Sequence, residues 1–448
     1  MVGAIGRQLS AISQRIANAV GKTGGDAGPT PPRGRITTYV PRLDQRLRDL
    51  TEGVTFASLR SLIKSGQWGD LARVAQVFSE FEERDTHLGS VARTRRLALT
   101  GLDWEIVSAA DVQQDISDRR LADDAAAYAR DHLSEIESFD EALEHLATAI
   151  GPNVAALELL WGETDLIGFV PVPPARLAMR PDRSPAIHVR TEDDIEGVPA
   201  TGDKWAIHIP QAATGVPTTK SLARTCATIW LIKMLAVADW ATYCEKYGMP
   251  VRTGKYKSGA TAEEKAELAD MLANMGANAW AMFSEAIDVE VKESSQRGTQ
   301  PYEALLGYCD RQLSIAWLGG HLTVDTAGAT GTYAAGAVQN EVRQDLRDDD
   351  IRRESRTVRR QILKPMMRYA FPGLDVPVPH FRRVVPDVVD RLREADLLTK
   401  ATQGIGLPVE LSHAYERLGI PAPEIDEATG LPVHPVVKRI AVNPFEGE

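Results

Sequence analysis

The sequence predicts an α+β protein that is mainly helical. Long stretches with apolar residues at helical spacing occupy most of the chain. Short alternating segments, which are typical of strands, fall chiefly in the first half. The hydrophobic fraction of 43% and the charged fraction of 25% are those of ordinary globular proteins. At 448 residues the chain is long enough for roughly two to four hydrophobic cores.

The first half is expected to alternate helices with short strands. Residues 21–35, GKTGGDAGPTPPRGR, predict a flexible arm because Gly and Pro dominate them. Residues 55–85 predict two amphipathic helices broken at Ser65-Gly66, and residues 86–99 predict a third. The segment LDWEIVSA predicts a strand. Helices over residues 116–136 and 139–150 then lead to expected strands at NVAALELLWGE, IGFVPVPPARLAMRP, AIHVRTED and KWAIHIP.

The centre is expected to contain two helices around a compact insert. Thr219–Tyr247 is apolar on nearly every side, which predicts a helix buried by several neighbours. Arg224, Lys233 and Asp239 interrupt it and argue against a membrane span. Pro301–Leu318 predicts the second helix. Between the two helices, PVRTGKY predicts a strand, TAEEKAELADMLANMG a helix and AWAMFSEAIDVEVKES a hairpin.

A very long helix is predicted from about Tyr333 to Phe371, with Pro365 as a kink. The segment VPVPHFRRVVPD then predicts a returning strand. Two further helices are expected at DVVDRLREADLLTKATQ and PVELSHAYERLG, and the proline-rich end predicts extended chain. The first residues lack a continuous apolar run of the kind found in secretory signals, so we expect synthesis in the cytoplasm.

A glycine-rich segment, Gly319–Ala337, lies between two predicted helices and raises the question of a nucleotide site. It contains no Lys and no GxGxxG pattern, and a helix precedes it, whereas a P-loop needs GxxxxGK[ST] after a strand. HExxH, GxSxG and EF-hand patterns are also missing, and the nine histidines are scattered. The sequence therefore predicts no catalytic residue, no cofactor and no metal site. An unfamiliar cytoplasmic enzyme stays open as an alternative without candidate residues.

The net charge of −11 argues against tight binding of DNA, because neutralisation of phosphates supplies most non-specific affinity. The densest charge lies at Arg343–Arg368, where acidic residues at Asp345 and 348–350 precede a group of basic ones. Two interpretations remain open: an exposed helix with intrahelical ion pairs, or a contact between subunits. DNA binding there is less favoured because of the interleaved acids.

The cysteines and tryptophans predict packing and not chemistry. The three cysteines have no CxxC spacing, so we interpret Cys226, Cys244 and Cys309 as small apolar fillers. Four tryptophans could stack on nucleotide bases, but each lies within an apolar pattern. Packing in the core or at an interface is therefore the favoured interpretation for Trp230, Trp240, Trp280 and Trp317.

The order of these elements resembles that of the portal proteins of tailed bacteriophages, and the amino-acid sequence itself is most similar to the Mu-like portal family. The resemblance covers about residues 36–420 and is extended, with no short catalytic signature. The stretches that show it are ITTYVPRLDQRLRDLTEG, SLARTCATIWLIKMLAVADWATYCEKYGMPVRTGKY and LGGHLTVDTAGATGTYAAGAVQNEVRQDLRDDD.

The resemblance implies a portal fold of wing, stem, clip and crown that assembles into a ring of twelve copies at one capsid vertex. Double-stranded DNA would be packaged and ejected through the ring, without a membrane and without enzymatic activity of this chain. The implied location is the virion, after assembly in the host cytoplasm, and the implied partners are terminase, the major capsid protein and head-completion or adaptor proteins. The implied segments are an arm (1–35), wing (36–218 and 333–390), stem helices (219–248 and 298–318), clip (249–297), tunnel loop (319–332) and crown with extended tail (391–448).

The resemblance also implies roles for particular residues. In a tunnel loop, glycines would let the backbone shift as DNA passes, and small apolar or hydroxyl side chains would touch the duplex weakly. The residues placed there are His321, Leu322, Thr323, Val324, Asp325, Thr326, Gly328 and Gly331. Charges expected at the channel or between subunits are Arg311, Arg352, Arg353, Arg356, Arg359, Arg360, Asp348, Asp349 and Asp350. Another ring-forming connector or minor head protein remains an alternative, which the length of the chain disfavours.

Overall fold

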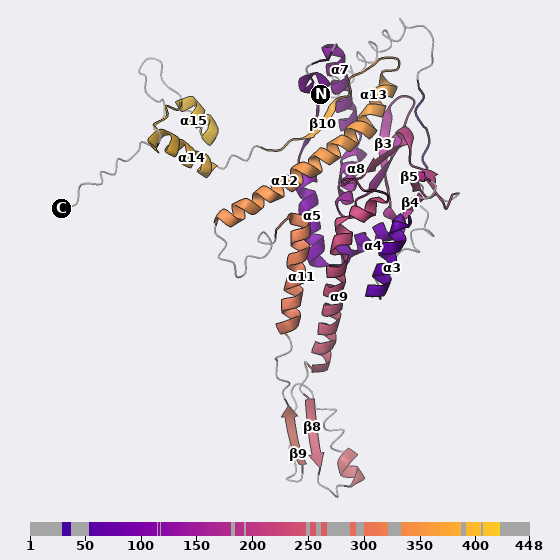
Figure 1. Cartoon of the computed structure of the whole chain (residues 1–448), viewed down its shortest axis with the longest axis vertical. Coiled ribbons are helices and arrows are strands. Elements are labelled where there is room, and N and C mark those ends of the chain that lie inside the picture. Colours follow the sequence, from indigo (N-terminus) through magenta and orange to yellow (C-terminus); the bar gives the residue numbers. More distant parts are fainter. Residues whose placement is uncertain are drawn as a thin grey trace, which may run out of the picture. The chain divides into compact units, whose positions relative to one another are not determined.

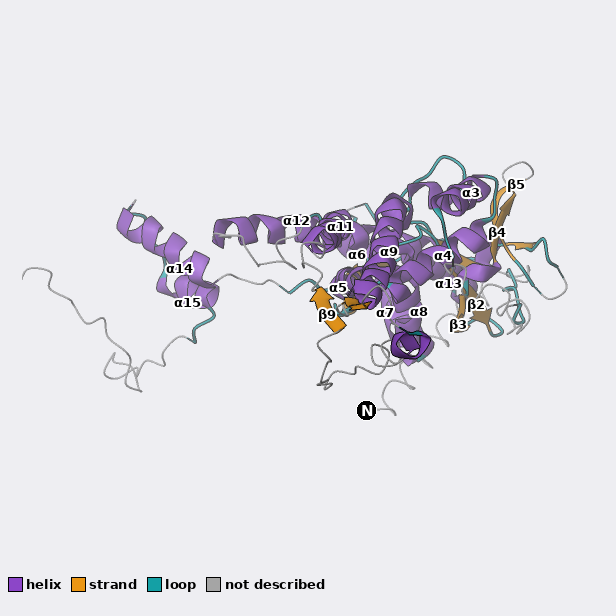
Figure 2. Ribbon diagram, turned by 90° about the horizontal axis from the view of Figure 1, so that it is seen from below, coloured by secondary structure: helices purple, strands orange, loops and turns teal. Residues whose placement is uncertain are grey.

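The computed structural model describes most of the chain, and its elements are labelled as in Figure 1. The described residues are 29–36, 53–113, 115–116, 118–180, 184–191, 194–247, 251–256, 261–266, 287–292, 300–320, 333–386, 391–404 and 406–421. The chain divides into two compact units, Met1–Val384 and Val385–Glu448. Figure 2 shows how strongly helices dominate among the described elements of the first unit.

Three consecutive helices begin the first unit: α3 (Phe56–Gln67), α4 (Leu71–Arg84) and α5 (Thr86–Thr100). The predicted break at Ser65-Gly66 is wrong, because both residues lie inside α3 and the chain turns at Trp68–Asp70 instead. Gly69 there has a φ of +104°, which glycine adopts without strain. Gly66 serves close packing, since a Cβ atom on it would lie 2.6 Å from Cγ2 of Val74.

Short antiparallel sheets follow. Strand β1 (Trp104–Val107) pairs with β10 (His380–Arg383), and helices α6 (Ala109–Val112), α7 (Arg119–Glu135) and α8 (Ser138–Ala147) lie between them in sequence. Strand β2 (Ala155–Trp161) is the centre of a sheet with β3 (Leu166–Val172) and β7 (Trp205–His208). A third sheet holds β4 (Leu177–Arg180), β5 (Ser184–Val189) and β6 (Val198–Pro199).

The segment IGFVPVPPARLAMRP is not one strand, as the sequence predicted, but two strands in different sheets. Proline lacks a backbone N–H and fixes φ, so the pair Pro173-Pro174 cannot continue a hydrogen-bonded ladder. The chain instead makes a 3₁₀ turn at Pro174–Arg176 and enters β4. Pro171 is tolerated within β3 because β3 is at the edge of its sheet.

Two long helices, α9 (Leu222–Tyr247) and α11 (Gln300–Leu318), confirm the helical predictions for the centre of the chain. Between them, β8 (Val251–Tyr256) and β9 (Ile287–Lys292) pair antiparallel, and residues 262–266 are helical. The predicted hairpin in AWAMFSEAIDVEVKES is represented by β9 alone, which pairs with β8. The other half of that prediction, including Trp280, lies outside the described residues.

The predicted long helix is present with one irregularity. Helix α12 (Tyr333–Val358) continues through a π-helical turn (Arg359–Leu363) into α13 (Lys364–Ala370). The amide of Lys364 donates to the carbonyl of Arg359, five residues earlier. The predicted kink at Pro365 thus takes the form of a π turn just before it, because proline offers no amide to an α-helical ladder.

Three clusters of buried side chains hold the first unit together. The largest joins α7, α8, β2 and β3 to the end of α12 and α13, with Phe139, Leu157 and Met366 among its members. The second joins α3, α4 and α5 to α9 and α11, and Phe81, Trp230 and Trp317 belong to it. The third lies under the β4–β6 sheet. The second unit contains α14 (Arg391–Thr399), a π turn (Lys400–Gly404) and α15 (Leu411–Leu418).

Within the described part of the chain, none of the helices combines the length and the apolar character that crossing a membrane requires. Cys226 and Cys309 are buried, as the prediction of apolar fillers requires, and burial raises the pKa of the Cys226 thiol to about 11. Cys244 does not fit that prediction, since it is exposed on the second half of α9.

Candidate functional site

Helices α9 and α11 pack against each other as an antiparallel pair, side by side in Figure 1. Near the middle, the ammonium of Lys233 on α9 lies 2.7 Å from Oδ1 of Asp310 on α11. Further along, Trp240 and Tyr302 lie with their rings almost parallel, at a centroid distance of 6.5 Å. From the first of these contacts to the second, the residue number rises along α9 and falls along α11, so the two helices run antiparallel.

The first half of α9 and the second half of α11 are anchored to the helices α4 and α5. Lys233 lies 2.5 Å from Oδ1 of Asp85, and only 9% of the lysine side chain is exposed. Asp85 also accepts hydrogen bonds from the amides that begin α5, at His87 and Leu88. Trp230 stacks on Phe81 at 4.0 Å and donates its indole N–H to the Phe81 carbonyl at 3.2 Å.

The other halves of both helices are exposed. Among the described side chains, none after Ala236 on α9 and none before Cys309 on α11 is buried. This surface is nonetheless apolar, with exposed large hydrophobic residues at Leu235, Val237, Leu305 and Tyr308. An exposed apolar surface of this kind indicates an interaction site. Trp230 and Leu231 of α9 are buried within this chain, whereas Leu235 is exposed.

The predicted tunnel-loop residues His321, Leu322, Thr323, Val324, Asp325, Thr326, Gly328 and Gly331 lie outside the described residues. The end of α11, just before this segment, is firmly held. Gly319 ends α11 with a φ of +74° and donates its amide to the Ile315 carbonyl at 3.0 Å. A Cβ atom at Gly319 would lie 2.6 Å from Cγ1 of Val342, so α12 passes directly over this glycine.

Arg95 of α5 links the two helices that flank the glycine-rich segment. Its guanidinium donates to both carboxylate oxygens of Asp350 on α12, at 2.9 and 3.1 Å. A third bond runs to the carbonyl of Trp317 near the end of α11, at 3.0 Å. Arg95 and Asp350 are almost fully buried, and a bidentate pair in such a place fixes geometry strongly. Sequence analysis missed this pair, because its members are 255 positions apart.

The charges that the sequence analysis expected at a channel or between subunits fall into three groups. Asp348 pairs with Arg347 at 2.9 Å, and Asp349 pairs with Arg352 and Arg353 one turn along the helix. Asp350 faces inward to Arg95, and Arg359 donates to the Val378 carbonyl at 3.2 Å. The third group is exposed and makes no ion pair within the described part of the chain; it comprises Arg311, Arg356 and Arg360. For these, a role at a channel or between subunits stays a prediction.

Two further buried polar contacts tie α12 to the sheets. Glu354 accepts two hydrogen bonds from Arg383 of β10, both at 2.8 Å; burial raises the pKa of this carboxyl and the arginine opposes the rise. His208 of β7 bonds to the Thr357 hydroxyl at 2.8 Å. Burial, aided by the charge of Arg353, lowers the pKa of His208 to about 4. A signal for the first pair existed in the sequence, since Arg383 is two residues after the apolar Phe381 in a strand and so lies on the same, inward face.

In the described residues no group of three or more His, Cys, Asp and Glu side chains is arranged to hold a metal ion. The arrangement that remains is mechanical. A helix pair is anchored at one end, apolar and exposed at the other, and coupled through Arg95 to a long helix beyond a glycine-rich segment.

Comparisons with known proteins agree with this arrangement. A family model described as the portal protein of Mu bacteriophage matches residues 75–420. The portal protein of Escherichia phage Mu is 29% identical over 399 residues, which cover 86% of this chain and 75% of that protein. The Mu-like prophage FluMu protein gp29 of Haemophilus influenzae is 27% identical over 378 residues, which cover 82% of this chain and 71% of that protein.

Two solved structures share the fold. A chain in the virion of a native gene transfer agent particle has a TM-score of 0.51 at 14% identity, covering 82% of this chain and 94% of its own. A chain in the neck of that kind of particle, computed with C12 symmetry, has a TM-score of 0.50 at 15% identity, covering 75% of this chain and 90% of its own. At such identities the similarity concerns the fold alone.

Proposed function

Since the chain belongs to the family of Mu bacteriophage portal proteins, we propose that its copies form the ring at one capsid vertex through which double-stranded DNA is packaged and ejected. The observation that supports this most directly is the exposed apolar surface at the far ends of α9 and α11. In a ring each copy uses two different faces, and such a surface becomes buried between neighbours.

The proposal extends to the parts of the subunit. Helices α9 and α11 are the stem, the β8–β9 insert is the clip, and the residues between α11 and α12 form the tunnel loop. The remaining sheets and helices of the first unit form the wing, and the second unit forms the crown. Twelve copies are proposed, as in the neck that was computed with C12 symmetry. The clip would receive terminase during packaging and head-completion proteins later, and the wing would face the major capsid protein.

Negative-stain imaging of the purified full chain tests the ring directly. We expect rings with a central hole, and a population of monomers or dimers alone would refute the proposal. The variants Leu305→Asp and Tyr308→Asp should disrupt rings, because each places a charge on the apolar stem surface. Ile195→Asp is a matched control, since Ile195 is 75% exposed on the β5–β6 connection, away from the stem helices.

The tunnel loop needs a separate test. Deleting residues 323–331 should leave the rings intact while DNA packaging or DNA retention fails, because Arg95 joins the two flanking helices directly. Loss of rings in this deletion would assign the segment to assembly instead.

A further inference from the structure

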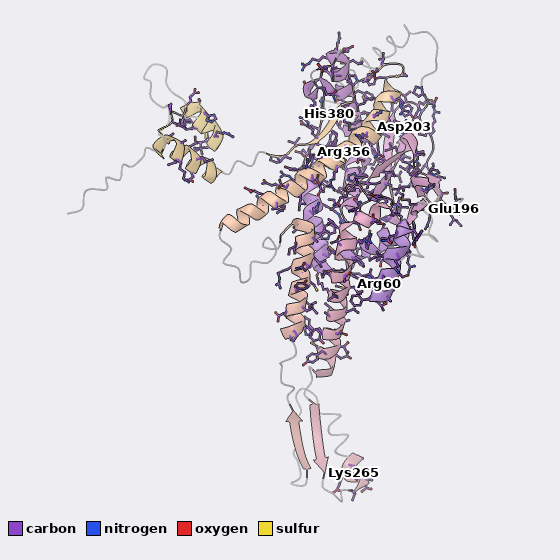
Figure 3. All side chains as sticks on the ribbon, viewed as in Figure 1. Arg60, Glu196, Asp203, Lys265, Arg356 and His380 are labelled. Atoms are coloured by element: carbon purple, nitrogen blue, oxygen red, sulfur yellow. The ribbon has the colours of Figure 1, made fainter. Side chains whose placement is uncertain are left out.

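A row of exposed cations runs along one face of α12 and α13. Every fourth residue from Arg352 to Arg368 is basic and exposed. Figure 3 labels Arg356, which lies on α12 within this row. We call this surface the basic stripe and define it by Arg352, Arg356, Arg360, Lys364 and Arg368.

The π-helical turn at Arg359–Leu363 keeps the stripe on one face. In a regular α-helix, residues four apart advance by about 40° beyond a full turn, so five such residues would spiral through about 160°. The extra residue that a π turn accommodates reduces the rotation of the later side chains about the helix axis by about 100°. The two halves of the stripe are thereby brought into line over a length of about 24 Å. On the opposite face Val358, Ile362 and Met366 are buried in the core.

The centre of the stripe is not neutralised by neighbouring acids. Residues 352–374 contain seven basic residues and one acidic residue, Glu354, which is buried against Arg383. Of the acids that precede the stripe, which made DNA binding unattractive at the level of sequence, Asp350 pairs with Arg95 and Asp348 with Arg347. Asp349 pairs with Arg353 and with Arg352, the first residue of the stripe.

Only the two ends of the stripe have a carboxylate partner. Arg352 lies 3.4 Å from Asp349, and Arg368 lies 2.9 Å from Asp203, which Figure 3 also labels. The three central cations, Arg356, Arg360 and Lys364, make no ion pair within the described part of the chain. No exposed large hydrophobic residue occurs between Arg352 and Arg368, the two ends of the stripe.

We propose that the basic stripe binds the phosphate backbone of double-stranded DNA lying along this face of the subunit. This inference rests on the proposed function, which brings DNA to the subunit, and adds a second contact besides the tunnel loop. A row of exposed cations about 6 Å apart along a helix can neutralise several phosphates of one duplex, whose charge is continuous along its length. A protein partner fits less well, because protein interfaces are depleted of charge at their centre, whereas DNA interfaces are polar and strongly positive.

A triple variant tests the stripe: Arg356→Gln, Arg360→Gln and Lys364→Gln. Its matched control is Arg60→Gln, Lys64→Gln and Arg73→Gln, which removes the same charges from exposed positions on α3 and α4. Binding of a short random-sequence duplex is measured by fluorescence anisotropy between about 50 and about 200 mM salt. The slope of log K against log salt should become shallower by about three in the stripe variant, one for each lost phosphate contact, and stay unchanged in the control.

Several results would overturn the inference. Equal salt slopes in the two triple variants would show that the stripe does not contact phosphate, and so would absence of duplex binding by the unmodified chain. Loss of rings in the stripe variant alone, with the thermal midpoint retained, would assign the stripe to a neighbouring copy. Failure of the unmodified chain to form rings would instead speak against the proposed function, while the salt slopes would still decide whether the stripe binds phosphate.

Discussion

Replacing Lys233 by methionine should destabilise the first unit strongly, although the two side chains have similar volumes. In the native chain the ammonium lies between Asp85 at 2.5 Å and Asp310 at 2.7 Å. The Asp85 side chain is fully buried, and one of its oxygens, Oδ2, has no hydrogen-bond partner. Lys233→Met therefore leaves a buried carboxylate without its cation, which costs about 3–5 kcal/mol.

The structure also predicts the stability cost of replacing each aspartate partner of Lys233. Asp310→Asn should cost at most about 1 kcal/mol, because 33% of the Asp310 side chain is exposed and Lys233 keeps Asp85. Asp85→Asn loses one charged hydrogen bond but keeps an oxygen for the α5 amides, so its cost is about 1.5–3 kcal/mol. The double variant Lys233→Met with Asp85→Asn should be less destabilised than the sum of the single variants, because no buried charge is left alone.

Urea unfolding followed by tryptophan fluorescence measures this order, since Trp230 belongs to the same buried cluster and stacks on Phe81. The reasoning fails if Lys233→Met is as stable as the native chain, or if Asp310→Asn costs as much as Lys233→Met. It also fails if the double variant shows simple additivity.

Three further outcomes are expected. Gly319→Ala should lower stability by about 1–3 kcal/mol, because φ is positive there and the new methyl group would meet Val342; a thermal midpoint equal to that of the native chain would contradict this. Gly66→Ala should destabilise through its contact with Val74, and the added change Val74→Ala should recover part of the loss in a thermal scan; additive losses would exclude the contact as the cause. Stability should fall as pH drops from about 6.5 towards about 4, because His208 binds a proton in the unfolded state but not in the folded state, where its pKa is lowered. The full effect on the free energy of unfolding is about 3 kcal/mol. His208→Gln should flatten the pH dependence of the thermal midpoint.

The sequence by itself determined the order, type and length of most elements, because helical and strand periodicity is a local property. The helix predicted over Thr219–Tyr247 runs from Leu222 to Tyr247, and the one predicted over Pro301–Leu318 runs from Gln300 to Leu318. The local pattern gave a wrong prediction where a glycine has a packing role and does not end a helix. Gly66 signals a helix break in sequence, yet in the fold it lets α3 approach Val74.

Only the tertiary structure decided which charged side chains form ion pairs and which do not. Arg95 and Asp350 lie 255 positions apart, and Glu354 meets Arg383 from another element, so no spacing rule connects them. The acids around Arg352 appeared to neutralise the whole basic segment, whereas in the fold Asp350 and Glu354 pair with arginines of other elements, and a π turn aligns the cations that remain unpaired. Periodicity is written into neighbouring residues, but the partner of a buried charge is chosen by the packing of segments far apart in the chain.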